Sequence, residues 1–169
     1  MPKYKYMKNL STIMWCLIIA GCYSSTSEKT GKEGAQMPEF NLQLADSATW
    51  LNTANIVSGK ATVFVFFSPT CPHCRAETQE IVEEIDDLKD IQFYFVTVAP
   101  LPWLKNYYNQ FQMNKYANIK AGVDTAQFIT KYFKIPGVPY TAIYGKDKKL
   151  ISTFVGEMSA AQLKKVAEG

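Results

Sequence analysis

Two cysteines separated by two residues, Cys71 and Cys74, are the side chains best suited to chemistry. They follow an apolar, strand-like run at 61–67 and precede a helical pattern, which places Cys71 at or just before the first helical turn. Free N–H groups and the positive end of the helix dipole favour a thiolate there. Cys74 lies deeper in the helix and is close enough to close a disulfide. The spacing predicts a redox-active dithiol in which Cys71 attacks and Cys74 resolves.

The two residues between the cysteines bear on the direction of exchange. Pro72 suits the first helical position, because its missing N–H would be unpaired there in any case. His73 is the single histidine of the chain, and as a cation it would further stabilise the Cys71 thiolate. A more stable thiolate stabilises the reduced form and makes the disulfide more oxidising.

Two other interpretations of the cysteine pair remain open. Half a zinc site would need more ligands, but the sequence has no second C-x-x-C or histidine pair, and His73 is badly placed to ligate with both cysteines. A purely structural disulfide is the second alternative, although a bridge across so short a loop restricts the unfolded chain only slightly. The redox-active interpretation is favoured, with no metal ligated.

The N-terminal residues are typical of a bacterial export signal. Residues 1–21 contain three lysines and no acid, and an apolar core at 13–20 is too short to span a bilayer as a mature helix. Residues 19–22, Ile-Ala-Gly-Cys, resemble a lipobox, which predicts lipid on Cys22. An ordinary signal peptide with an incidental cysteine is the alternative.

Removal of this signal changes the charge and the domain limits. The formal net charge falls from +3 to zero when the first 21 residues and their three lysines are lost, which argues against a nucleic-acid partner. The stretch 22–36 is small and polar and predicts a flexible tether. The remaining part, 37–169, is long enough for one domain with a single core.

Hydrophobic patterning predicts the elements of that domain. Strands are expected at 39–44, 61–67, 91–98, 119–123, 140–144 and 150–155. Helices are expected after Cys74, at 101–113 with Trp103, Tyr107 and Phe111 as a core stripe, at 125–133 with Asp124 or Thr125 as its cap, and from Ser159. Strand and helix alternate first and a hairpin closes the sheet, so the fold class is α/β with a central mixed sheet flanked by helices.

Three motifs together resemble the thioredoxin superfamily. They are Cys-Pro-His-Cys at 71–74 after a buried strand, Ile-Pro-Gly-Val-Pro at 135–139 before a later strand, and Gly156 after the last strand. The strand extension at 40–44, the lipoprotein signal and Cys-Arg-Ala-Glu at 74–77 are similar to the TlpA/ResA-like thiol–disulfide oxidoreductases. The resemblance covers residue 37 to the C-terminus. It implies a thioredoxin-like fold with an N-terminal strand extension, and no flavin, nucleotide or metal cofactor.

The resemblance also assigns roles to individual residues. Pro139 matches the cis-proline that faces the dithiol, so Val138 would present its backbone to a substrate chain, beside Thr70 and Pro72 of the active-site loop. Glu77 matches a glutamate that handles protons for the buried thiol in ResA-like proteins. A plain surface acid in the first turns of the helix is the alternative for Glu77.

Some positions depart from the pattern. A buried Asp and a Trp that precede the first cysteine in thioredoxins are replaced by Val65 and Thr70, which puts the proton acceptor for Cys74 in doubt and strengthens the case for Glu77 or water. The Pro-His dipeptide and Val138 look like the oxidase DsbA. The large helical insertion of DsbA has no room in this chain.

The function implied is that of a membrane-anchored, extracytoplasmic thiol–disulfide oxidoreductase acting on protein substrates as a reductase. Protein thiols and disulfides are the expected partners, with apocytochromes as candidates, together with a membrane redox protein that recycles the dithiol. The anchor on Cys22 would face the periplasm. Many enterobacterial lipoproteins are retained on the inner membrane by an Asp directly after the lipidated cysteine. This position is Tyr23 here, so the outer membrane is favoured.

Three alternative functions stay open. A disulfide-forming oxidant or isomerase would use the same dithiol in another direction. A peroxiredoxin-like peroxidase expects a threonine three residues before its reactive cysteine, where Ser68 stands. A lipid-anchored binding module without catalysis would keep the fold alone.

Overall fold

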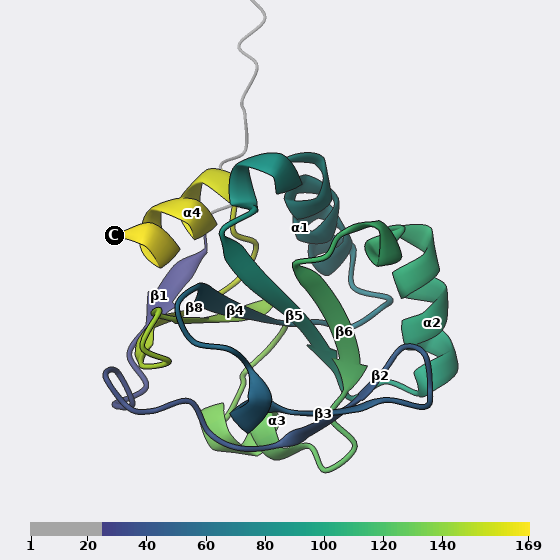
Figure 1. Ribbon diagram of the computed structural model, residues 1–169, viewed down its shortest axis with the longest axis horizontal. Coiled ribbons are helices and arrows are strands. Elements are labelled where there is room, and N and C mark those ends of the chain that lie inside the picture. Colours follow the sequence, from purple (N-terminus) through teal and green to yellow (C-terminus); the bar gives the residue numbers. More distant parts are fainter. Residues whose placement is uncertain (1–24) are drawn as a thin grey trace, which may run out of the picture.

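The computed structural model describes residues 25–169, which form one mixed eight-stranded sheet with helices on both faces (Figure 1). The strands are β1 (Thr26–Glu28), β2 (Asn41–Leu44), β3 (Trp50–Asn52), β4 (Ala61–Phe66), β5 (Ile91–Thr97), β6 (Ile119–Val123), β7 (Tyr140–Tyr144) and β8 (Leu150–Val155). The helices are α1 (Pro72–Glu83), α2 (Leu101–Gln110), α3 (Phe128–Phe133) and α4 (Ala160–Glu168), with 3-10 turns at Thr53–Asn55, Ile85–Leu88 and Met113–Lys115. The predicted signal at 1–21 and the lipidation site Cys22 lie outside the described residues.

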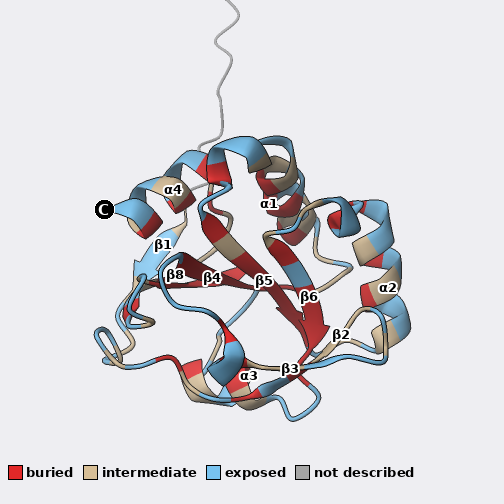
Figure 2. Cartoon of the chain, viewed as in Figure 1, coloured by how far each residue is buried: buried red, intermediate tan, exposed pale blue. Residues whose placement is uncertain are grey.

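The centre of the sheet consists of strands that the apolar runs predicted. The strand order is β1-β8-β7-β4-β5-β6-β2-β3, with β4, β5 and β6 parallel and β7 antiparallel to β4. All six residues of β4 are buried, as expected for a strand with neighbours on both sides and layers on both faces (Figure 2). The structure therefore confirms the predicted α/β class with a central mixed sheet.

Alternation along β4 creates two cores, one on each face of the sheet. Val63 and Val65 face the cluster formed with α1, α2 and α4, whereas Phe64 and Phe66 face the cluster that includes α3. Figure 1 shows α1, α2 and α4 on one side of the sheet and α3 on the other. The first of these faces supports the helix that begins at the cysteines.

The expected tether at 22–36 is wrong for the part that the structure describes, residues 25–36. Thr26–Glu28 pairs antiparallel with β8 as the edge strand β1, and Gln36 bridges to Lys149. Composition suggested a tether because these residues have little to bury. An edge strand needs only backbone hydrogen bonds, so polar side chains can remain on its exposed face.

The predicted stripe on α2 is partly wrong. Tyr107 and Phe111 are buried, but Trp103 is 52% exposed and Leu104 is fully buried in its place. In a helix with 3.6 residues per turn, each step of four residues rotates the side chain by about 40°. Three residues at this spacing therefore span about 80°, and Trp103, at one end of the series, lies off the apolar face. Trp103 instead lines a pocket beside Pro69 and Thr70.

The helix expected at 125–133 begins later, at Phe128. Gln127 adopts a left-handed conformation at its N-cap and provides no side-chain cap. The buried Asp124 reaches forward, and its Oδ2 accepts a hydrogen bond of 2.9 Å from the Ile129 N–H. Asp124 therefore satisfies a free N–H of the first turn, although it lies three residues before the N-cap.

Candidate active site at the start of helix α1

Cys71 lies where the prediction placed it, at the N-cap of α1. The chain leaves the carboxyl end of β4 through Ser68, Pro69 and Thr70, and Pro72 occupies the first turn. The Cys71 Sγ accepts a hydrogen bond from the Cys74 N–H at 3.4 Å. Cys71 is half-buried and Cys74 is buried, and both are free thiols. The helix end therefore directs an N–H group at the sulfur of Cys71, as anion stabilisation requires.

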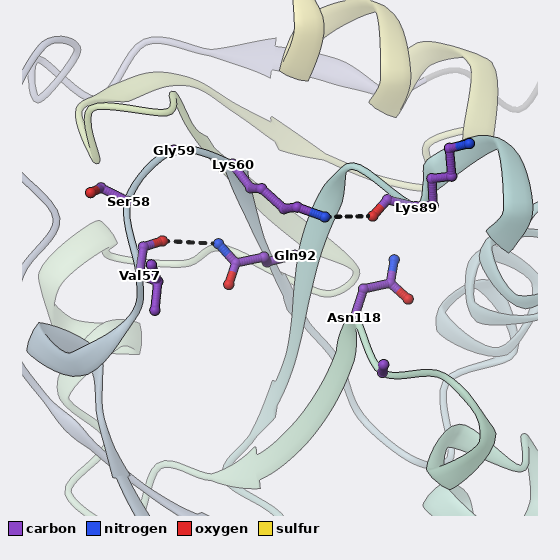
Figure 3. A pocket seen from close by; sticks show the side chains of 8 residues that line it. Val57, Ser58, Gly59, Lys60, Lys89, Gln92 and Asn118 are labelled. Carbon is purple, nitrogen blue, oxygen red and sulfur yellow. Dashed lines mark hydrogen bonds between the residues drawn. The ribbon is translucent and has the colours of Figure 1, made fainter.

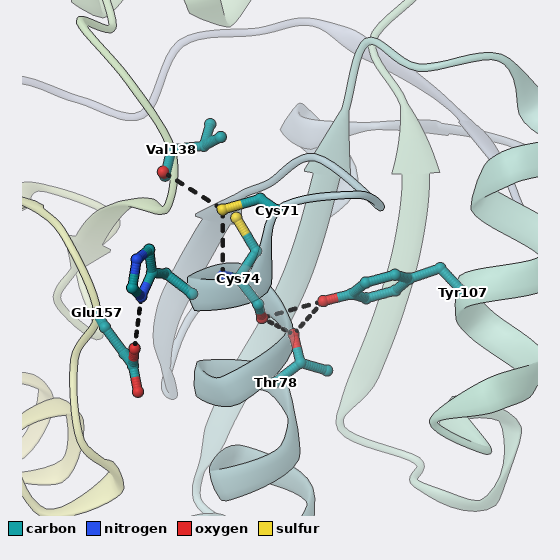
Figure 4. A network of polar contacts seen from close by, with 7 residues as sticks. Cys71, Cys74, Thr78, Tyr107, Val138 and Glu157 are labelled. Atoms are coloured by element: carbon teal, nitrogen blue, oxygen red, sulfur yellow. Dashed lines mark hydrogen bonds and ion pairs between the residues drawn. The ribbon is translucent and has the colours of Figure 1, made fainter.

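The loop before β7 faces this sulfur from the opposite side. The Val138–Pro139 peptide bond is cis, as predicted. The Cys71 thiol donates to the Val138 carbonyl oxygen at 3.7 Å, and Figure 4 shows Val138 next to the two sulfur atoms. The backbone of Val138 is thus positioned next to the reactive group.

The second thiol is held in a dry environment. Burial raises the pKa of Cys74, and its side-chain contact with Cys71 adds to the rise. Its carbonyl oxygen accepts hydrogen bonds from the hydroxyls of Thr78 at 2.8 Å and Tyr107 at 3.0 Å (Figure 4). These contacts fix the first turn of α1 below the dithiol. The sequence analysis did not identify them, but a tyrosine in an apolar stripe was a usable signal, because a buried hydroxyl needs a partner.

Glu77 is fully buried on α1, so the surface-acid alternative is wrong. Its Oε1 accepts a hydrogen bond of 3.2 Å from Thr141 Oγ1 on β7, and its Oε2 has no hydrogen-bond partner within residues 25–169. Burial raises the pKa of Glu77 to about 8, and the charge of Glu157 acts in the same direction. The carboxyl group is therefore mainly protonated at neutral pH. A charge on Glu77 would in turn raise the pKa of Cys74.

His73 lies beside a carboxylate that the sequence did not predict. Its Nδ1 lies 3.4 Å from Oε2 of Glu157, which follows Gly156 at the end of β8. Gly156 has a positive φ of 94°, and its N–H donates to the Pro139 carbonyl at 2.9 Å. This turn carries Glu157 to the side of the active-site loop. No spacing signal links His73 to Glu157, because their approach depends on the turn at Gly156.

Of the predicted substrate residues, Thr70 and Pro72 flank Cys71 in the chain, and Val138 faces it from the loop before β7. The Thr70 and Ser68 hydroxyl oxygens lie 3.1 Å apart.

Throughout 25–169, no three His, Cys, Asp or Glu side chains are grouped so that they could hold a metal ion. No helix within that range has the length and apolar character needed to cross a membrane.

A dithiol at a helix N-terminus, opposite a cis-proline on a mixed α/β sheet, defines a thioredoxin-like protein. The family model described as Redoxin matches residues 32–168. The chain belongs to the Redoxin family. A comparison with curated proteins finds no match.

Solved structures share this fold. A secreted disulfide oxidoreductase of Mycobacterium tuberculosis, described as homologous to DsbE of E. coli, has 22% identity and a TM-score of 0.61, over 75% of this chain and 92% of that one. StoA from Bacillus subtilis has 18% identity and a TM-score of 0.59, over 76% and 96%. The thioredoxin domain of a thiol–disulfide oxidoreductase from Bacteroides vulgatus has 16% identity and a TM-score of 0.64, over 80% and 95%. These likenesses confirm the predicted thioredoxin-like fold.

Proposed function

We propose that the protein is a thiol–disulfide oxidoreductase that reduces disulfides in protein substrates. The Cys71 thiolate attacks one sulfur of the substrate disulfide, and the other substrate sulfur leaves as a thiolate. Cys74 then attacks the Cys71 sulfur of the mixed disulfide and releases the second substrate thiolate. The dithiol is oxidised to a disulfide, two electrons pass to the substrate, and two protons end on its thiols. The observation that carries this proposal is the Cys71 sulfur between the Cys74 N–H and the Val138 carbonyl.

Glu77 is the proposed proton carrier for the buried thiol. Cys74 must lose its proton before it can resolve the mixed disulfide, and burial opposes this loss. Glu77 is buried on the same helix and interacts electrostatically with Cys74. Its pKa is raised to about 8. A group with this pKa can both accept and donate a proton near neutral pH.

The contact between His73 and Glu157 supports the reductive direction over an oxidant. A cationic His73 would stabilise the reduced form and make the disulfide more oxidising. Glu157, 3.4 Å from His73 Nδ1, places a negative charge beside that cation and offsets its field at Cys71. The Pro-His loop alone therefore does not make this site equivalent to that of a strong oxidant.

The proposed location is the cell envelope, with the protein anchored through lipid on Cys22 and facing the periplasm, on the outer membrane. The M. tuberculosis relative in fold is described as secreted, which supports a place outside the cytoplasm. Substrates would be protein disulfides, apocytochromes among them, and a membrane redox protein would return electrons to the dithiol.

Two variants test the chemistry. Cys71→Ser should abolish the acceleration by the protein of insulin reduction by dithiothreitol, because the attacking sulfur is lost. Cys74→Ser should accumulate a mixed disulfide with substrate that is visible on a non-reducing gel, because the resolving sulfur is lost. Full activity of Cys71→Ser would overturn the mechanism. Consumption of peroxide by the wild type without insulin reduction would replace it with a peroxidase.

A further inference from the structure

A pocket of about 250 Å³ opens next to the reactive cysteine, on the side of α2. It lies between the active-site loop and that helix, and it begins one residue before Cys71. Its lining residues are Pro69, Thr70, Arg75, Trp103, Asn106, Tyr107 and Gln110. A polypeptide whose disulfide is attacked by Cys71 would therefore pass close to this pocket.

Arg75 gives the pocket a positive charge held in a fixed position. The carbon at the centre of its guanidinium lies 5.3 Å from the ring centroid of Phe111 and 5.8 Å from that of Tyr107, and Nη1 donates to the Pro69 carbonyl at 3.5 Å. Stacking on two rings restrains the side chain before any ligand binds. No ion pair found within residues 25–169 includes Arg75. Most of its N–H donors thus remain available.

Two side-chain amides add further hydrogen-bond donors to the pocket. The side-chain amides of Asn106 and Gln110 line it from one face of α2, and both residues are exposed. Trp103 forms an apolar wall, with 52% of its surface exposed. None of the lining side chains carries a negative charge. This set of donors suits a carboxylate, which accepts several hydrogen bonds and pairs with a guanidinium in a bidentate manner.

A larger pocket at the other end of the sheet shows the contrast. It has a volume of about 660 Å³ and lies where β4, β5 and β6 begin (Figure 3). The dithiol follows the opposite, carboxyl end of β4. Lys60 Nζ donates to the Lys89 carbonyl at 3.2 Å, and Gln92 Nε2 donates to the Val57 carbonyl at 3.0 Å. Two of its donors, Lys60 and Gln92, therefore bind backbone of the protein itself, and the pocket lies far from the reactive sulfur.

The region on the opposite side of Cys71 is apolar. A second small pocket there, of about 200 Å³, is lined by Val98, Ile135, Pro136 and Val138 among others. Val98 is 51% exposed and Val138 is 39% exposed. An acidic side chain of a bound substrate would thus be accepted on one side of the reactive sulfur only.

We propose that the Arg75 pocket is a specificity subsite for an aspartate or glutamate side chain that lies near the reactive cysteine of a polypeptide substrate. This inference rests on the proposed function. The carboxylate pairs with the guanidinium, the amides of Asn106 and Gln110 supply further hydrogen bonds, and Trp103 covers the aliphatic part of the side chain.

The test uses symmetric disulfide dimers of short peptides. Glutamate is placed at one of three positions on either side of the cysteine, and each peptide has a partner with glutamine at the same position. Reduction by the purified dithiol protein is followed as the rate of peptide thiol formation. At one or more positions on a single side of the cysteine, the glutamate peptide should react about fivefold faster than its glutamine partner, with a smaller ratio in high salt.

Variants assign this preference to the pocket. Arg75→Met should bring the ratio to one, and Arg75→Lys should leave an intermediate ratio, because it keeps the charge and loses the fork. Trp103→Ala should also lower the ratio and provides a second variant at an exposed position. Lys105→Met removes the same charge from α2 outside the pocket and should keep the preference, which separates a local contact from a general field.

Each outcome decides between the proposals. Equal reduction of glutamate and glutamine peptides at every position by the wild type would overturn the subsite and leave the proposed function standing. A preference that persists in Arg75→Met, or that Lys105→Met removes equally, would also overturn it. Failure of the wild type to reduce any peptide would overturn the proposed function, and the subsite with it.

Discussion

The two sides of helix α1 place a charged residue in opposite environments, one buried and one open to solvent. Glu77 is fully buried, and its Oε1 accepts a hydrogen bond from Thr141 of β7. Arg75, two residues earlier, is half-buried and points to the open pocket beside α2. Both residues lie within one turn of Cys74.

The difference follows from what each group can do with its charge. A carboxylate taken out of water is unfavourable, and Glu77 lowers this cost by binding a proton, which its pKa of about 8 reflects. A guanidinium cannot lose its proton, so Arg75 keeps its charge, stacks on aromatic rings and stays near solvent. The dry side of the helix is therefore suited to moving protons, and the wet side to recognising a substrate.

The largest expected effect concerns the buried side and the dependence of stability on pH. The pKa of Glu77 rises from 4.5 in the unfolded chain to about 8 in the folded protein. Between these values the folded state holds a proton that the unfolded state has lost, so this group's contribution to the free energy of unfolding falls as pH rises. The slope is at most about 1.4 kcal/mol per pH unit. Glu77→Gln should remove this decline, measured by chemical denaturation at pH 5, 7 and 8.5.

The control for this prediction is Glu83→Gln, which changes the same charge at an exposed position of α1. It should keep the slope of the wild type. An identical slope in Glu77→Gln and the wild type would show that Glu77 is not a buried, protonated group.

The next effect concerns Tyr107, which contributes to both sides. Its hydroxyl donates to the Cys74 carbonyl, and its ring supports Arg75. Tyr107→Phe keeps the ring and removes the hydroxyl, so the free energy of unfolding should fall by about 2 kcal/mol through a lost buried hydrogen bond. Tyr108→Phe, at the neighbouring half-exposed position, should change it far less. Equal effects of the two variants would contradict the network drawn from Cys74, Thr78 and Tyr107.

A smaller effect is expected at Thr141. Thr141→Val keeps the shape and removes the hydroxyl that donates to Glu77, at a cost of about 1 kcal/mol. Because that hydrogen bond lowers the pKa of Glu77, the stability decline should extend to higher pH in the variant. Thr153→Val removes a buried hydroxyl that bonds to the Glu28 carbonyl instead. Thr153→Val should lower the free energy of unfolding by a similar amount, and it should not change the pH at which the decline in stability ends.

The smallest effect on stability is expected on the open side. Trp103→Ala should change the free energy of unfolding by less than about 0.5 kcal/mol, because its side chain is 52% exposed. Leu104→Ala, one residue further and fully buried, should cost about 2–5 kcal/mol. A large loss in Trp103→Ala would restore the interpretation of Trp103 as a core residue.

Local signals predicted much of the fold and of the dithiol. The bounds of β6, β7 and β8 agree with the predicted strands, because each is a short segment with several apolar residues between turn residues. The N-cap position of Cys71 and the place of Pro72 followed from helix-end chemistry, which acts over a few residues. The cis bond before Pro139 was expected from family resemblance and is observed.

Features that depend on distant contacts were not predicted. His73 and Glu157 are 84 positions apart in the sequence, and only the turn at Gly156 brings them within 3.4 Å. β1 depends on backbone pairing with β8, which leaves no side-chain pattern. The burial of Glu77 follows from the packing of α1 on β7 and α4, whereas its sequence neighbours are typical of a solvated face.

An equilibrium redox titration of the Cys71–Cys74 pair against defined thiol–disulfide buffers tests the central claim most directly. The fraction of oxidised protein would be read by alkylation of the remaining thiols. A reductase in which Glu157 offsets His73 should have a potential near that of thioredoxin, about −270 mV, or lower. A potential at or above about −180 mV, the range of disulfide isomerase and DsbA, would contradict the reductive direction. The protein would then donate or rearrange disulfides.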